Sequence, residues 1–139
     1  MYLEFLKYQA TGNDFVIVDY RFNNVRHLTT NKIRTLCDRN LGIGSDGFIE
    51  IYDSNNFDFK MIYYNSDGKK ASLCGNGTRC AVKYIANILK KEKVSFEAFD
   101  GKHIGFLNNN NDVSIGMSDV KDFNVFENYM LFETGSPHY

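Results

Sequence analysis

The sequence predicts an α+β fold, in which a mostly antiparallel sheet wraps around one central helix at residues 75–91. Short runs rich in β-branched and aromatic residues, separated by turn residues, recur along the 139-residue chain and indicate strands. One longer segment instead repeats apolar residues with the period of a helix. The hydrophobic content of 43% is enough for a packed core, and the strand-rich order with two helices is typical of the α+β class.

Four strands are expected in the first half of the chain, because four runs there have strand composition. These runs cover residues 2–10, 15–18, 48–52 and 57–64. The turn Thr-Gly-Asn-Asp at 11–14 joins the first two as a hairpin. Thr29 or Thr30 can then cap a short helix that continues to Cys37, and a glycine-rich loop at 41–47 precedes the third strand.

The central helix is expected from apolar residues at Val82, Ile85, Ala86 and Leu89, which are spaced as i, i+3, i+4 and i+7. Lysines that follow this stripe complement the negative end of the helix dipole. Further strands are expected after the helix, two of them joined by the Asp-Gly turn at 100–101. They cover residues 94–99, 103–107, 113–117 and 129–132.

Composition and charge exclude several classes of protein. The net charge is −1 with both signs interspersed, whereas a nucleic-acid-binding protein would show a basic excess. No apolar run approaches the roughly 20 residues that span a bilayer, and the first residues lack the pattern of a signal peptide. Three cysteines without framework spacing favour the reducing cytoplasm over a disulfide scaffold, and no histidine lies at a metal-ligand spacing from them. We therefore expect a cytoplasmic protein that binds no nucleic acid, membrane or metal.

Cys74 is the candidate for chemistry, because it lies directly before Gly-Asn-Gly at the start of the central helix. Unpaired N–H groups and the positive end of the dipole point towards such a position, so the field there favours a thiolate. The same N–H groups can bind an anion such as an α-carboxylate, and Gly75 and Gly77 let it approach the backbone. Together these features suit proton removal α to a carboxylate. A helix start with an inert cysteine and turn glycines is the alternative.

The other candidate residues carry weaker local signals. Cys37 and Cys80 each fall within a predicted helix and are expected in the core. Asn13 and Asn65 stand in tight turns next to acidic residues, where each follows or ends an apolar strand. Either amide could meet a polar ligand, and the alternative for both is an Asx turn.

Four segments of the chain resemble the diaminopimelate epimerase family, and they occur in the family's order. Each segment alone is a weak signal, but four of them in order are specific, and the resemblance extends over essentially the whole chain. They are Thr-Gly-Asn-Asp-Phe at 11–15, Asp-Arg-Asn-Leu-Gly-Ile-Gly-Ser-Asp-Gly at 38–47, Asn-Ser-Asp-Gly at 65–68 followed by Cys-Gly-Asn-Gly-Thr-Arg-Cys at 74–80, and Gly-Ser-Pro-His at 135–138.

The resemblance implies a two-lobed isomerase, each half a sheet wrapped on a central helix, with the halves facing each other across a cleft. One cysteine from each lobe meets the substrate α-carbon from opposite sides and interconverts LL- and meso-diaminopimelate, without pyridoxal phosphate or metal, for lysine and peptidoglycan biosynthesis. Cys74 resembles the first-lobe thiol, and His138 resembles a histidine near the reacting centre. A small amino-acid substrate and, in the full-length protein, a homodimer are also implied. Substrate contacts are implied for Asn13, Asn65, Gly75, Asn76 and Ser136.

Three departures from the family pattern limit what is carried over. Ser136 stands where many members have asparagine, and Gly47 stands where some have glutamine, so no side-chain role is expected at 47. The second-lobe motif with its own cysteine does not occur before Tyr139. We therefore expect an N-terminal lobe at 1–117, followed at 118–139 by a crossover and the start of a second lobe, and a chain that is inactive alone. A proline racemase-like enzyme and a non-catalytic single-lobe binding module are the alternatives.

Overall fold

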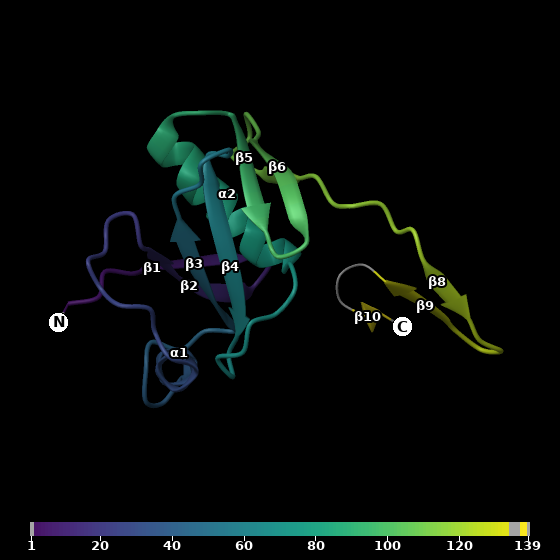
Figure 1. Ribbon diagram of the computed structural model, residues 1–139, viewed down its shortest axis with the longest axis horizontal. Helices are drawn as coiled ribbons and strands as arrows, with labels where there is room; N and C mark the ends of the chain where they lie inside the picture. Colours follow the sequence, from purple (N-terminus) through teal and green to yellow (C-terminus); the bar gives the residue numbers. More distant parts are fainter. Residues whose placement is uncertain (1, 134–136, 139) are drawn as a thin grey trace.

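A curled sheet packed against one long helix forms the main body of the protein (Figure 1). The structure is a computed structural model and describes residues 2–133 and 137–138. The long helix is α2 (Gly75–Leu89), and a shorter helix, α1 (Thr30–Cys37), packs on the other face of the sheet. Within the described residues the sheet has seven strands, which are β1 (Leu6–Ala10), β2 (Asn13–Asp19), β3 (Gly47–Tyr52), β4 (Phe59–Asn65), β5 (Lys93–Ala98), β6 (Gly101–Leu107) and β7 (Val113–Ile115).

The strands lie in the sheet in the order in which they occur in the chain. Among the described residues, four of the six neighbouring pairs are antiparallel, which confirms the predicted class. The pairs β2–β3 and β4–β5 are parallel, so the sheet is mixed. Parallel neighbours need a long crossover connection, and here the two helices provide it, α1 for the first pair and α2 for the second.

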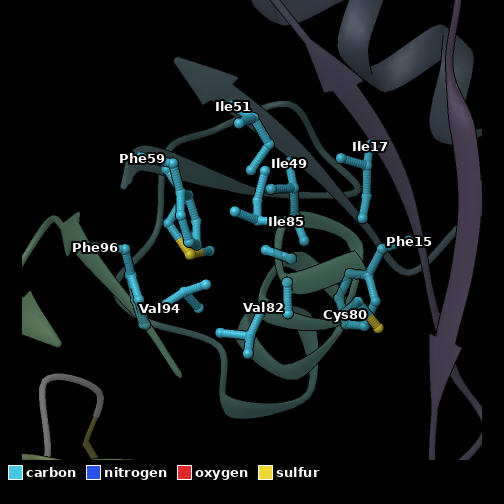
Figure 2. Close-up of a cluster of buried hydrophobic side chains, with 13 residues drawn as sticks. Phe15, Ile17, Ile49, Ile51, Phe59, Cys80, Val82, Ile85, Val94 and Phe96 are labelled. Atoms are coloured by element: carbon cyan, nitrogen blue, oxygen red, sulfur yellow. The ribbon is translucent and has the colours of Figure 1, made fainter. Parts of the chain in front are cut away.

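The core lies between the sheet and α2, as Figure 2 shows. Side chains of one period-two face of the strands meet the apolar stripe of the helix, and the predicted stripe residues Val82, Ile85 and Ala86 are buried there. Burying one large aliphatic or aromatic side chain contributes about 1.5–3 kcal/mol. The strand residues of this cluster are Phe15, Ile17, Ile49, Ile51, Phe59, Met61, Val94 and Phe96.

A second cluster on the opposite face holds α1 against the sheet. It joins Val16, Val18 and Phe48 of the strands to Ile33 and Cys37 of the helix. Because the middle of β2 is buried on both faces, its sequence is a continuous apolar run and not an alternating one.

The observed bounds agree with the predicted elements to within a few residues. The first hairpin turns at residues 11–12, and α1 begins after Thr29, whose hydroxyl accepts a hydrogen bond from the Lys32 amide at 3.4 Å, as expected. The helix α2 ends at Leu89 and not at 91, because Lys90 adopts a left-handed conformation (φ 53°) that stops it.

A separate three-stranded sheet follows the main one, and in Figure 1 it lies apart from it. Its strands are β8 (Phe123–Val125), β9 (Met130–Glu133) and β10 (Pro137–His138). Strand β9 was expected, whereas β8 was not, because its three residues are too few to show a period. The division of the chain at residues 117 and 118 stays a prediction. No helix in the described part of the chain is long and apolar enough to cross a membrane.

The contact between β6 and α2 yields a test of this packing. A Cβ added at Gly105 would lie 2.5 Å from Cγ2 of Val82, so Gly105→Ala should lower the free energy of unfolding by about 1–3 kcal/mol through overpacking. Urea denaturation would measure the loss. Gly116→Ala is the control, since its Cβ would meet its nearest neighbour at an ordinary 3.6 Å. In a Val82→Ala background the cost of Gly105→Ala should largely disappear, and a full additive cost would contradict the proposed close approach.

Candidate functional site

One edge of the sheet brings together the ends of three strands that carry predicted site residues. Strand β2 begins at Asn13, β3 begins at Gly47 and β4 ends at Asn65. In the register of the sheet, Gly47 lies between Phe15 of β2 and Asn65 of β4. Residues far apart in the sequence therefore share one edge, and the start of α2 packs against the same edge.

Cys74 lies at this edge as the N-cap residue of α2. Its backbone is extended, its side chain makes no capping hydrogen bond, and it is half-buried. The Sγ atom lies 4.0 Å from Oδ1 of Asn13, and that oxygen accepts a hydrogen bond from Nδ2 of Asn76 at 3.2 Å. Sequence reasoning proposed Cys74 and Asn13, and the family resemblance added Asn76 to the same site; in the structure the three side chains lie together.

The side-chain amide of Asn13 is held in a fixed orientation by hydrogen bonds at both its nitrogen and its oxygen. Nδ2 of Asn13 donates to Oδ2 of Asp46 at 2.8 Å, while Oδ1 faces Cys74 and Asn76. The amide thus connects the loop before β3 to the start of α2. Asn65 lies at the same edge but is exposed, and its carbonyl accepts the Gly68 amide in the turn that follows β4.

A cluster of charged residues, formed by Lys7, Asp14, Arg39 and Asp46, lies beside Asn13. Sequence reasoning did not identify these four residues as a cluster. The Arg39 guanidinium binds Oδ1 of Asp14 at 2.7 Å and Oδ1 of Asp46 at 2.9 Å, while Lys7 Nζ lies 2.7 Å from Oδ2 of Asp14. The hydrogen bond from Arg39 is the main reason why the pKa of the Asp14 carboxyl lies well below its usual range. The sequence signal was that Asp14 stands in one of the four family-like segments and that Arg39 and Asp46 stand in another.

The two glycines at the start of α2 have different surroundings. A Cβ at Gly75 would meet nothing within 4 Å, so the backbone there can be approached from outside, as expected. A Cβ at Gly77 would lie 3.2 Å from Ile49 and 3.3 Å from Phe15. The expectation that Gly77 opens the backbone to an anion was therefore wrong, because its missing side chain faces the core and allows α2 to approach the sheet.

The other two cysteines are buried, as predicted. Cys37 and Cys80 each expose 3% of their surface, and Figure 2 shows Cys80 beside Phe15 in the core. Burial raises the pKa of the Cys37 thiol and raises that of Cys80 to about 11. Both thiols are therefore protonated at neutral pH and behave as small apolar side chains.

Tyr63 is a neighbour of Cys74 that sequence reasoning missed. Its ring stands on β4 beside Gly47 and packs edge-on against Phe15 at 6.2 Å between centroids. Tyr63 and Cys74 both pack against the apolar cluster around α2. Burial is the main reason why the pKa of Tyr63 lies far above its ordinary value, and the proximity of Cys74 adds to the shift. In the sequence Tyr63 is one aromatic of a strand, and only the register places it against Gly47.

The remaining predicted residues lie where the structure says little about their side chains. The backbone of His138 belongs to β10 and pairs with Phe132, but its side chain lies outside the described part, as does Ser136.

A hollow of about 590 Å³ is lined by Thr11, Arg79 and Lys83, among others, and not by Cys74 or Asn65. Its lining includes Thr11 and Arg79, whose side chains both hydrogen-bond Oδ1 of Asn76.

Solved structures with a similar fold include racemases and epimerases that act on amino acids. A probable proline racemase from Agrobacterium radiobacter K84 superposes with a TM-score of 0.62 at 10% identity, over 94% of this chain and 48% of its own. A phenazine biosynthesis protein of the PhzF family from Bacillus anthracis gives a TM-score of 0.60 at 19% identity, over 90% and 42% of the two chains. At these identities the likeness defines the fold alone.

Sequence comparison identifies the family within that fold. A sequence model of diaminopimelate epimerase matches residues 5–121, and the chain therefore belongs to the diaminopimelate epimerase family. The diaminopimelate epimerase of Flavobacterium psychrophilum is 43% identical over 138 residues, 99% of this chain and 54% of that protein. That of Prochlorococcus marinus NATL2A is 40% identical over 123 residues, 83% and 43% of the two chains. The chain thus spans about half the length of these relatives.

The three environments predict an order of thiol reactivity. In the native protein at neutral pH, Cys74 should react first with iodoacetamide, since it is half-buried whereas Cys37 and Cys80 are buried and protonated. Peptide mapping by mass spectrometry would follow each site. Cys37 and Cys80 should label only after unfolding, and native labelling of either before Cys74 would contradict the assignment.

The Asp14 carboxylate predicts a pH-dependent contribution to stability. Its folded pKa lies below the unfolded value of about 3.9, so its contribution is present above pH ~4 and is lost as the pH falls through the folded pKa. In Arg39→Gln the Asp14 titration followed by carbon NMR should move up towards that unfolded value. The stability difference from wild type should shrink in acid.

The control for this prediction is Arg34→Gln, which removes a positive charge from α1 where the structure records no bond to Asp14 or Asp46. It should leave the Asp14 titration unchanged. An unshifted Asp14 in Arg39→Gln would show that the guanidinium is not what holds its pKa low.

Proposed function

We propose that this chain supplies the first-lobe half of the active site of a diaminopimelate epimerase, which interconverts LL- and meso-diaminopimelate in lysine biosynthesis without pyridoxal phosphate or metal. The observation that carries the proposal is the position of Cys74 at the open start of α2, in contact with Asn13. The 43% identity to the Flavobacterium relative supports diaminopimelate over proline-type substrates, since the likeness to the proline racemase is one of fold.

In this proposal the backbone N–H groups at the start of α2 bind the α-carboxylate of the substrate. A helix start offers such groups together with the positive end of the dipole, and Gly75 leaves the approach open. The carboxylate then lies beside Cys74, whose thiolate takes the proton from the adjacent α-carbon. Negative charge that develops on the carboxylate in this step is stabilised by the same N–H groups. Asn13 and Asn65 at the edge orient the rest of the amino acid.

Inversion also needs an acid on the opposite face of the α-carbon. Cys37 and Cys80 do not serve, because both are buried and neither is free to approach a substrate held beside Cys74. We therefore propose that the second thiol comes from the part of the protein that corresponds to the other half of its relatives, together with His138 and Ser136 near the cleft. The functional unit is proposed to be a cytoplasmic homodimer.

The test is the conversion of LL- to meso-diaminopimelate by the longest natural form of the protein that carries this chain. Cys74→Ala should lower kcat by at least about 10²–10⁴-fold, the usual contribution of a positioned base. Cys37→Ala is the matched control and should keep most of the activity. Stereochemical analysis of product formed in deuterium oxide would show whether hydrogen exchange accompanies inversion. Wild-type activity in Cys74→Ala would contradict the proposal.

Residues 1–139 alone should give no inversion, because a lone thiol that removes a proton tends to return one to the same face, and in an open half-cleft the carbanion is poorly stabilised. Robust inversion by this fragment would show that a second acid lies within these residues.

A further inference from the structure

We propose that Arg79 is a positioning residue that fixes the orientation of the Asn76 side-chain amide, so that the amide nitrogen and not the oxygen lies on the side of Cys74. The inference deepens the proposed function and rests on it in one respect, namely that the start of α2 binds the carboxylate of the substrate. It follows from a chain of side-chain hydrogen bonds that begins at Arg79 and ends at Asp46.

The first hydrogen bond of this chain joins two residues of α2. A nitrogen of the Arg79 guanidinium donates to Oδ1 of Asn76. A guanidinium has donors and no acceptor, so the atom of Asn76 that it contacts has to be the oxygen. Residues three apart lie on one side of a helix, so the contact needs no distortion of α2. Arg79 therefore determines which end of the Asn76 amide points away from it.

The next two hydrogen bonds pass through Asn13. Because Oδ1 of Asn76 points to Arg79, Nδ2 of Asn76 donates to Oδ1 of Asn13 at 3.2 Å. Nδ2 of Asn13 donates in turn to Oδ2 of Asp46 at 2.8 Å, and an ionised carboxylate only accepts. The chain thus has a donor-only group at one end and an acceptor-only group at the other. Neither amide can turn over without placing two donors or two acceptors against each other.

Thr11 also contacts Asn76 but does not determine its orientation. The Thr11 hydroxyl lies 3.2 Å from Oδ1 of Asn76 and 2.7 Å from the carbonyl oxygen of Ala10, so its single proton is shared between two acceptors. A hydroxyl can donate or accept, and it would tolerate either end of the amide. Thr11 therefore supports the orientation that Arg79 imposes.

Lys83 offers a comparison for Arg79 on the next turn of α2. Both side chains are half-buried and line the same hollow, and neither forms an ion pair within the described residues. Lys83 donates to the carbonyl oxygen of Asn111 at 3.3 Å, whereas Arg79 donates to Asn76. The two cations therefore have similar surroundings and differ in whether they hold the Asn76 amide.

The orientation of the Asn76 amide matters for an anionic ligand. Nδ2 of Asn76 binds Oδ1 of Asn13, and that oxygen lies 4.0 Å from Sγ of Cys74, so Nδ2 is on the side of the thiol. An amide nitrogen has two N–H groups, and one of them is used on Asn13. The other can donate to a carboxylate at the start of α2, where Gly75 leaves the backbone open. With the amide turned over, its oxygen would face that carboxylate and repel it.

The first test needs no substrate. It follows hydrogen exchange of the Asn76 side-chain amide by NMR, in the longest natural form of the protein labelled with nitrogen-15. Arg79→Met keeps an unbranched side chain and removes the donor, so exchange should become about tenfold faster, as expected for the loss of one hydrogen bond. Lys83→Met removes the same charge from the next turn and should leave the rate unchanged. Equal rates in Arg79→Met and wild type, or equal acceleration in both variants, would overturn the proposal.

Further variants separate orientation from stability. Arg79→Lys retains a cation that only donates, so its exchange rate should lie closer to that of wild type than to that of Arg79→Met. Thr11→Val removes the hydroxyl at nearly constant shape and should accelerate exchange less than Arg79→Met does. The reverse order in either comparison would contradict the proposal. The backbone amide of Val82 in the core should keep its wild-type rate in Arg79→Met. Acceleration there by the same factor would show that Arg79 stabilises α2 as a whole, which would also overturn the proposal.

Steady-state kinetics test the consequence for the substrate. With LL-diaminopimelate, Arg79→Met should raise KM by about tenfold and lower kcat by a smaller factor, since the carboxylate is bound in the ground state and in the transition state alike. A merely structural role would lower kcat through a smaller folded fraction, and a fall in kcat as large as the rise in KM would contradict the inference. The exchange rates decide the inference even if the protein acts on another substrate, so its failure and that of the proposed function are distinguishable.

Discussion

The close approach of α2 to the sheet is the constraint on which the rest of the structure depends. Glycines allow it at two points: Gly77 lies against Phe15 and Ile49, and Gly105 of β6 lies against Val82. With both points fixed and the apolar stripe of the helix buried between them, the first turn of α2 can lie only at the edge where β2 and β3 begin. The same packing that stabilises the fold therefore places the open start of α2, with its unpaired N–H groups, next to the polar side chain of Asn13. A shift of the helix by one turn would move its start by about 5.4 Å and separate them.

At that edge a network of ion pairs and hydrogen bonds lies beside the half-buried thiol of Cys74. The ion pairs of Arg39 with Asp14 and Asp46 tie the start of β2 to the loop before β3, and Asn13 extends this connection to α2. Cys74 stands on it half-buried, with one side towards solvent. The charged cluster pairs two cations, Lys7 and Arg39, with two carboxylates, so its main effect is to fix the position of Asn13 through Asp46.

The fold was largely predictable from the sequence, whereas the site was predictable only in part. The period of α2 and the composition of the strands follow from local chemistry, and so does the capping position of Thr29. Strand neighbours do not, because the parallel pairs join segments that lie dozens of residues apart. Local signals marked Cys74 and Asn13 as candidates, but only the register brings Tyr63 to Gly47, and nothing local distinguishes Gly75, which opens the backbone, from Gly77, which serves the core.

The central claim is that the start of α2 holds the carboxylate of an amino acid beside Cys74. Amide NMR of the nitrogen-15-labelled protein during titration with meso-diaminopimelate tests it directly, because an N–H that donates a hydrogen bond to a new anionic partner changes its chemical shift. We expect the backbone amides of residues 75–77 and the side-chain amide of Asn13 to shift together and to saturate with one affinity. Unchanged signals at 75–77, with shifts confined to the hollow lined by Lys83 and Asn111, would contradict it.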